Sequence, residues 1–159
     1  PDGVTIGQSK AIERFLARRF GLMGENDVDA ALIDCIAEHC RDVKDAQMKK
    51  RFSMFVRDRS EEEKEEAQKE WFETDMPEML AKIEASIEKV SISEGLAVGS
   101  SISYADVCIF SLLKECFPVY KEATLLAAKD CPLLLGICDN FSNNPKVIQW
   151  MEQRPETNF

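Results

Sequence analysis

The start of a buried helix is encoded by the stretch Ile102-Ser103-Tyr104-Ala105-Asp106-Val107. In this pattern the Ser103 side chain accepts a hydrogen bond from the Asp106 N–H, and the Asp106 carboxylate accepts one from the Ser103 N–H, so the pair forms a capping box with Asp in place of Glu. Ile102 and Val107 supply the accompanying hydrophobic staple. The apolar residues that follow place this helix in the core. Loss of the Asp106 carboxylate is expected to cost about 1 kcal/mol or more.

Helical periodicity continues towards the N-terminus from this stretch. A long helix is predicted from a cap at Asp27 to about residue 49 or 51, and its apolar stripe comprises Val28, Leu32, Cys35, Ile36, Cys40 and Val43. Ser60, followed by three glutamates, predicts the cap of another helix, because acids stabilise a first turn. Pro77 starts or restarts a helical segment, since proline is tolerated in a first turn. The expected fold class is all-α.

A short extended stretch and one helix precede these elements. Asp2-Gly3 predicts a turn, Val4-Thr5-Ile6 predicts a strand, and Ser9 predicts the N-cap of a helix whose apolar residues recur at helical spacing. Free N–H groups and the helix dipole attract a carboxylate or phosphate there, and the side chains of Gln8 and Ser9 add hydrogen bonds. Two interpretations remain open at this point: a cap alone, or an anion site.

The composition describes a single acidic globular domain. The 159 residues are 45% apolar and 31% charged, which is enough to build one core. The net charge of −9 argues against nucleic acid or an anionic membrane surface as a partner, because both repel an acidic protein. No apolar run approaches the roughly eighteen residues that span a bilayer. A cytoplasmic location is expected.

The cysteines predict neither a metal site nor a disulfide framework. Six are present, with no C-x-x-C pair, and His39 is the sole histidine. Zinc sites and thioredoxin-type redox motifs need closer spacing, so no metal is expected. Because the cysteines fall on apolar helical faces, they are predicted to be reduced and mostly buried.

Three motifs in order resemble the cytosolic glutathione transferase family. They are Gln8-Ser9-x-Ala11-Ile12, the Ser103-x-Ala105-Asp106 capping box, and a proline-spaced tail containing Cys131-Pro132, Asn144-Pro145 and Arg154-Pro155. The tail is similar to that of sigma-like and related classes. The resemblance implies that residues 1–24 are the last strand and helix of a thioredoxin-like glutathione-binding domain, and that residues 25–159 are the all-helical C-terminal domain. It also implies that roughly fifty to sixty residues, with the catalytic Tyr or Ser, precede Pro1.

The resemblance also implies a glutathione site divided between two subunits of a homodimer. In the family the Gln-Ser pair, here Gln8 and Ser9, holds the γ-glutamyl end of glutathione. Three acids, Asp34, Glu38 and Asp42, recur at i, i+4 and i+8 on the long helix, a like-charge spacing that needs partners or screening. Alignment with the family places Asp42 at the acid that reaches the partner subunit's glutathione, with Asp34 or Glu38 next if the register slips. An electrophile pocket is expected along the long helix and the C-terminal segment, and its candidate aromatic residues are Phe52, Phe55 and Phe159.

The expected function is therefore glutathione transfer. A full-length protein would conjugate the glutathione thiolate to a hydrophobic electrophile or isomerise a substrate such as a prostaglandin endoperoxide, whereas this chain alone would hold no thiolate-stabilising hydroxyl and would be inactive. No catalytic residue is assigned within the chain. The alternative is a non-catalytic, transferase-like binding or structural module, as in lens crystallins. Retention of Gln8, Ser9 and Asp42 favours the enzyme, because a scaffold has no need of them.

Overall fold

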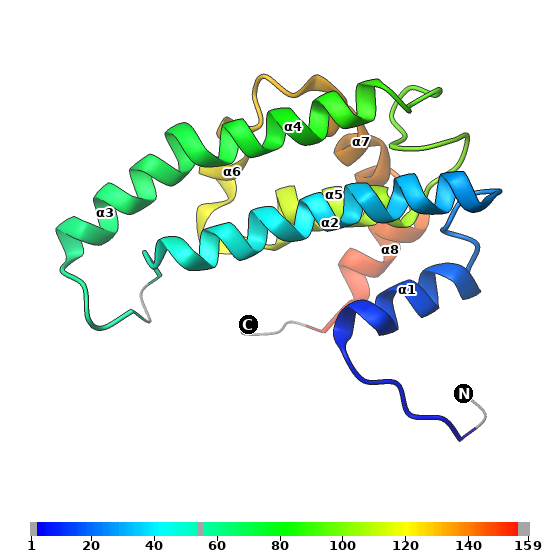
Figure 1. Cartoon of the computed structure of the whole chain (residues 1–159), viewed down its shortest axis with the longest axis horizontal. Helices are drawn as coiled ribbons and strands as arrows, with labels where there is room; N and C mark the ends of the chain where they lie inside the picture. Colours follow the sequence, from blue (N-terminus) through cyan, green and yellow to red (C-terminus); the bar gives the residue numbers. More distant parts are fainter. Residues whose placement is uncertain (1–2, 54–55, 156–159) are drawn as a thin grey trace.

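The computed structural model describes residues 3–53 and 56–155, and every regular element in these residues is helical. The eight α-helices are α1 (Ser9–Arg19), α2 (Asp27–Lys50), α3 (Glu61–Glu70), α4 (Met76–Glu88), α5 (Tyr104–Phe110), α6 (Lys121–Ala127), α7 (Pro132–Ser142) and α8 (Pro145–Gln153) (Figure 1). Three short segments join some of them, namely the π-helical η1 (Trp71–Asp75) and η2 (Ser111–Glu115) and the 3₁₀-helical η3 (Pro118–Tyr120). The all-α prediction is confirmed.

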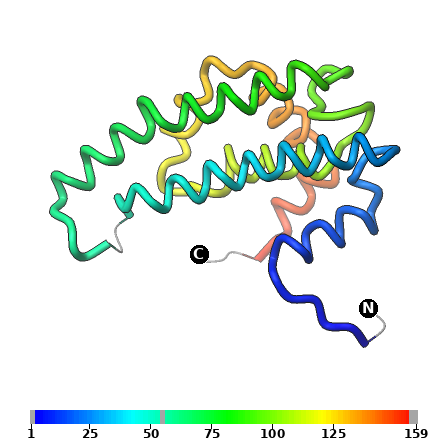
Figure 2. The backbone as a smooth tube through the Cα atoms, in the orientation of Figure 1, coloured from blue at the N-terminus to red at the C-terminus, as the bar shows by residue number. Residues whose placement is uncertain are grey.

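The core forms around α5. This helix contacts α2 on one side and α7 on another, while α4 packs on both α2 and α7. Ala105 and Ile109 of α5 are buried, and so is Leu112 of η2, which continues the helix, as the apolar run predicts. Figure 2 shows α2 and the α3–α4 rod as two long, neighbouring segments joined at one end by residues 51–60, with α1 on the side of α2 away from α4.

The capping box at the start of α5 is confirmed. Asp106 is 1% exposed, and its Oδ2 accepts from the Ser103 N–H at 2.8 Å and from the Ser103 hydroxyl. Its Oδ1 accepts from the Ala97 N–H at 3.0 Å, a contact across the preceding loop that the local pattern does not predict. The carboxylate therefore fixes both the start of the core helix and the loop that leads into it.

The helix predicted from Ser60 is confirmed, with Ser60 and Glu63 in a second capping box. It runs on through η1 into α4 without a break, and Pro77 occupies the first turn of α4. Proline has no N–H and its ring crowds the preceding turn, so an ordinary α-helix would kink or break there. The wider i to i−5 bond from the Met76 N–H to the Trp71 carbonyl opens that turn and accommodates the ring.

The N-terminal predictions need two corrections. Residues 4–7 form no strand, because no second extended segment within the described residues lies beside them to pair with. Ser9 is the first helical residue rather than the N-cap; the cap position belongs to Gln8, whose φ of 69° turns the chain into α1 without a side-chain hydrogen bond. The turn at Gln8 sets where α1 begins, but no side chain caps the N–H groups of its first turn.

The long helix is confirmed, but its cap and buried stripe are shifted. Its N-cap is Asn26, whose side chain accepts from the N–H groups of Val28 and Asp29. Val28 and Cys35 are exposed, whereas the buried positions are Ile33, Ile36, Ala37, Cys40 and Val43. The buried residues lie where α2 packs against α5 and α4. The sequence allowed either of two faces of α2 to be the buried one, and tertiary packing decides between them.

Candidate functional site

Unpaired backbone donors mark the start of α1. The Gln8 carbonyl accepts from the N–H groups of Ala11 at 3.0 Å and Ile12 at 3.1 Å. Within the described residues no acceptor faces the N–H of Ser9 or Lys10, and the side chains of Gln8 and Ser9 are exposed. A positive φ is uncommon for a residue other than glycine, and such backbone is concentrated at binding sites. The start of α1 therefore offers two N–H donors, a hydroxyl and an amide to a solvent-borne anion.

The acid stripe on α2 is divided by a single arginine. Arg14 on α1 donates from Nε to Asp34 Oδ1 at 2.8 Å and from Nη2 to Glu38, and Glu38 also pairs with Arg41. These bonds, with the one to Asp34 the largest, outweigh burial and raise the pKa of Arg14. Asp34 and Glu38 are thereby neutralised and join α1 to α2.

Asp42 has a different environment. It is exposed, and no cation lies within ion-pairing distance of it among the described residues. Of the three acids that the sequence offered, it is the one left available to a ligand or a second chain. Within the described residues of one chain, no hydrogen bond or ion pair joins Asp42 to Gln8 or Ser9.

A hydrogen bond between α1 and α5 was not predicted from the sequence. The Tyr104 hydroxyl donates to Glu13, which Lys10 also contacts at 2.7 Å. Burial raises the pKa of Tyr104, and its hydrogen bond to Glu13 raises it further. Burial also opposes ionisation of Glu13, but the bonds from Lys10 and Tyr104 outweigh it and lower the pKa of that carboxyl. A phenol held protonated in this way serves as a positioning donor rather than as a base.

A pocket of about 410 Å³ lies at the end of α2; we call it the α2-end pocket. Its walls come from the last turn of α2, the loop after it and residues 116–120, and they include Met48, Arg51, Phe52, Val56, Phe117 and Val119. Phe52 packs edge-on against Tyr120 with ring centroids 5.6 Å apart and also contacts Phe72. Phe52, one of the aromatic residues expected at an electrophile pocket, lines this pocket, while Phe55 and Phe159 lie outside the described residues. The volume is typical of small-molecule sites.

The cysteines are all unpaired. Cys40, Cys131 and Cys138 are buried, and Cys35 is exposed, which differs from its predicted place on the apolar stripe. Burial raises the pKa of Cys40 and raises that of Cys131 to about 11, so these two thiols are poor nucleophiles. None of the helices in residues 3–53 and 56–155 has the length and hydropathy needed to cross a membrane.

Comparison with known proteins identifies the family. The family described as "Glutathione S-transferase, C-terminal domain" matches residues 45–154. Hematopoietic prostaglandin D synthase of Gallus gallus is 32% identical over 98% of this chain and 71% of its own length, and S-crystallin 4 of Enteroctopus dofleini is 27% identical over 98% and 73%. The crystal structure of a monomeric glutathione S-transferase from Necator americanus superposes with a TM-score of 0.77 at 26% identity, covering 100% of this chain and 74% of that one.

The fold is thus that of the helical part of a glutathione transferase. The chain belongs to the glutathione S-transferase family.

Proposed function

We propose that the full protein containing this chain conjugates the glutathione thiolate to hydrophobic electrophiles. The observation that carries the proposal is the pairing pattern along α1 and α2: Arg14 occupies Asp34 and Glu38 but leaves Asp42 exposed and unpaired, while donors at the start of α1 also remain free. The γ-glutamyl end of glutathione carries one carboxylate and one ammonium, which match these two kinds of group.

The two halves of this site are best joined across a homodimer. Ser9 and Gln8 would receive the γ-glutamyl carboxylate in one subunit, and Asp42 of the other would receive the ammonium. A two-fold arrangement satisfies both sites at once, because each subunit lends one acid to its partner. The relative from Necator americanus is described as monomeric. A measurement of the oligomeric state of the full protein therefore tests the proposed homodimer.

In this proposal residues 1–24 belong to a glutathione-binding domain and residues 25–159 form the helical domain. The α2-end pocket takes the electrophile, because its walls are mainly apolar and it lies along the same long helix as Asp42. A hydroxyl from outside these 159 residues stabilises the thiolate, so the chain by itself is inactive. Tyr104 does not replace that hydroxyl, because its phenol is occupied by Glu13. The proposed setting is the cytoplasm, with no metal.

The alternative function is a non-catalytic binding or structural module. It has a specific point in its favour, since S-crystallins match the chain over nearly its whole length at 26–27% identity. The two functions are separated by incubating the full protein with glutathione and 1-chloro-2,4-dinitrobenzene, an activated aryl halide. The enzyme gives saturable conjugation well above the uncatalysed rate. A rate equal to the uncatalysed one, with glutathione present in excess, would exclude the enzyme and favour the structural module.

A further inference from the structure

A second groove lies between α6 and the helix formed by α3 and η1; we call it the α3–α6 groove. Its volume is about 320 Å³. The residues that line it include Glu65, Lys69, Phe72, Glu73, Ala123 and Leu126. It shares no lining residue with the α2-end pocket, so the proposed glutathione chemistry does not use it.

The groove has an apolar floor that the core holds in place. Phe72 is half-buried there, and its ring packs against Tyr120 and Phe52 with centroid separations of 5.4 and 6.0 Å. On the other wall, α6 buries Thr124 in the core and leaves Leu126 68% exposed. A large apolar side chain in water beside a half-buried ring offers area that a partner can bury. Docking needs little rearrangement, because both walls are already packed on the core.

The rim of the groove lies in the most acidic part of the chain. Residues 61–75 contain eight acidic and two basic residues, whereas the whole chain has 29 and 20. Glu65 and Glu73 line the groove, are exposed and form no ion pair within the described residues, unlike Glu61, which pairs with Lys64. The groove therefore offers two free carboxylates, about two helical turns apart, beside its apolar floor.

One cation, Lys69, is found among the lining residues that the structure describes. It lies one turn from Glu65 and one turn from Glu73 in the sequence, and it is exposed and pairs with neither. Its stem is apolar and flexible, so it can lie along the floor or move aside while the ammonium stays in water. The lining therefore keeps a net negative charge.

Charge decides which occupant fits the groove. A second copy of this chain would bring the same acidic segment against itself, because a two-fold contact places like surfaces together. Anionic membranes and nucleic acid are repelled for the same reason. A basic peptide is attracted, and a helical one presents apolar residues at i and i+3 or i+4 on the face that enters a groove.

We propose that the α3–α6 groove docks a basic amphipathic helix of another protein, with an apolar anchor between Phe72 and Leu126 and lysine or arginine side chains at Glu65 and Glu73. This interaction goes beyond the proposed transfer reaction and does not rest on it. Docking requires neither glutathione nor the proposed dimer.

The test is fluorescence anisotropy of labelled peptides titrated with the full protein, without glutathione. The first peptide has about eighteen residues, long enough to form a helix, and consists of leucine and lysine in amphipathic order. The second replaces each lysine by glutamate, and the third replaces each leucine by serine. The leucine–lysine peptide is expected to bind at least about ten-fold more tightly than either of the others. Equal affinity for the first peptide and either of the others would overturn the proposal, as would no binding of the first.

Leu126→Ser and Val28→Ser are the matched variants for the apolar anchor. The two positions are 68% and 67% exposed, and Val28, at the start of α2, does not line the groove. Both replacements leave the core intact, but only Leu126→Ser is expected to weaken binding of the leucine–lysine peptide, by about ten-fold. Equal losses in the two variants would overturn the assignment to the groove.

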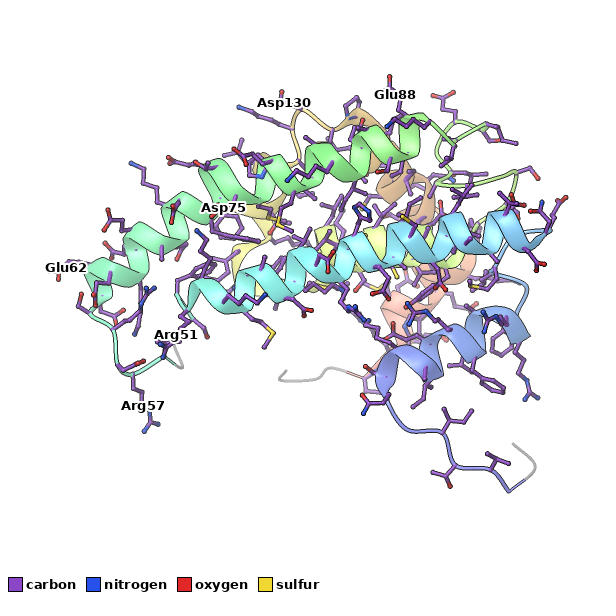
Figure 3. All side chains as sticks on the ribbon, in the orientation of Figure 1. Arg51, Arg57, Glu62, Asp75, Glu88 and Asp130 are labelled. Carbon is purple, nitrogen blue, oxygen red and sulfur yellow. The ribbon has the colours of Figure 1, made fainter. Side chains whose placement is uncertain are left out.

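Two double variants test the charged contacts. The first is Glu65→Gln with Glu73→Gln, and its control is Glu62→Gln with Glu88→Gln. Figure 3 shows Glu62 and Glu88 near opposite ends of the α3–α4 rod, and neither lines the groove. Each double variant removes two negative charges, but only the first is expected to weaken binding, by about five-fold, as for the loss of two exposed ion pairs. Equal losses would mean that net charge alone attracts the peptide and would overturn the proposed contacts.

Sedimentation of the full protein without peptide tests a second copy as the occupant. The same oligomeric state is expected for the wild type and Leu126→Ser, because the acidic rim disfavours self-association at this groove. Self-association that Leu126→Ser abolishes would place a second copy in the groove and would overturn the docking of a basic helix.

Discussion

Removal of the Asp106 carboxylate tests the physical account of the core most sharply. The side chain accepts from the N–H groups of Ser103 and Ala97, both of which are buried, and from the Ser103 hydroxyl. Asp106→Ala leaves two buried backbone donors without acceptors, and each such donor costs about 1–3 kcal/mol. We therefore expect a loss of about 4 kcal/mol in the free energy of unfolding, which corresponds to a fall of about 8–16 °C in Tm for a protein of this size.

Asp106→Asn separates hydrogen bonding from packing. The amide keeps one oxygen, so it satisfies one of the two buried donors and is expected to cost about half as much, roughly 2 kcal/mol. The control is Asp130→Ala, at an exposed position in the loop between α6 and α7 that is labelled in Figure 3. This variant is expected to change the free energy of unfolding by no more than about 0.5 kcal/mol. Urea unfolding monitored by circular dichroism measures all three variants. A loss below about 1 kcal/mol for Asp106→Ala would refute the reasoning.

Three further predictions concern α1 and the thiols. Arg14→Met unpairs Asp34 and leaves Glu38 with Arg41 alone. It is expected to cost about 1 kcal/mol, a value reduced because all three side chains are partly exposed, and to speed hydrogen exchange in α1. Because the pKa of Tyr104 is raised in the folded state, the Tyr104 phenol contributes its full stabilisation below about pH 10, the pKa of an unfolded tyrosine, and this stabilisation is lost as the pH rises above that value. Tyr104→Phe is expected to reduce the loss of stability at alkaline pH. Exposed Cys35 is expected to react first with Ellman's reagent, and Cys35→Ser to remove the fastest phase.

Each of these has a clear contrary result. Unchanged exchange in α1 after Arg14→Met would show that other contacts hold this helix, and Arg18→Met, at an exposed position on the same helix, controls for lost charge. The same alkaline slope in wild type and Tyr104→Phe would remove the phenol as its cause. A fast thiol phase that persists in Cys35→Ser would place the reactive cysteine elsewhere.

Local patterns predicted those parts of the fold whose causes are local. The helix cap at Ser60 and the capping box at Ser103 depend on residues within one turn, so both were predicted from the sequence and both are confirmed. The sequence did not predict which face of α2 is buried. Val28 and Cys35 are apolar enough to lie in the core, and only the packing of α2 against α5 decides that they are exposed. The strand at residues 4–6 failed for the same reason, since a strand depends on a neighbour.

The candidate site divides in a similar way. The sequence supplied Gln8, Ser9 and the three spaced acids, but the choice among the acids came from family resemblance. The structure adds a physical difference, because Arg14 lies twenty or more positions from Asp34 and Glu38 and its pairing with them is tertiary. That Asp42 remains unpaired agrees with its proposed role without testing it.

Glutathione titration of full-length Asp42→Asn tests the central claim most directly. Asp45→Asn is the matched control, an exposed acid on the same helix with no ion pair among the described residues. If Asp42 receives the glutathione ammonium, its variant should bind glutathione about ten-fold more weakly, while the Asp45 variant binds as the wild type does. Unchanged affinity in Asp42→Asn would contradict the proposed glutathione site.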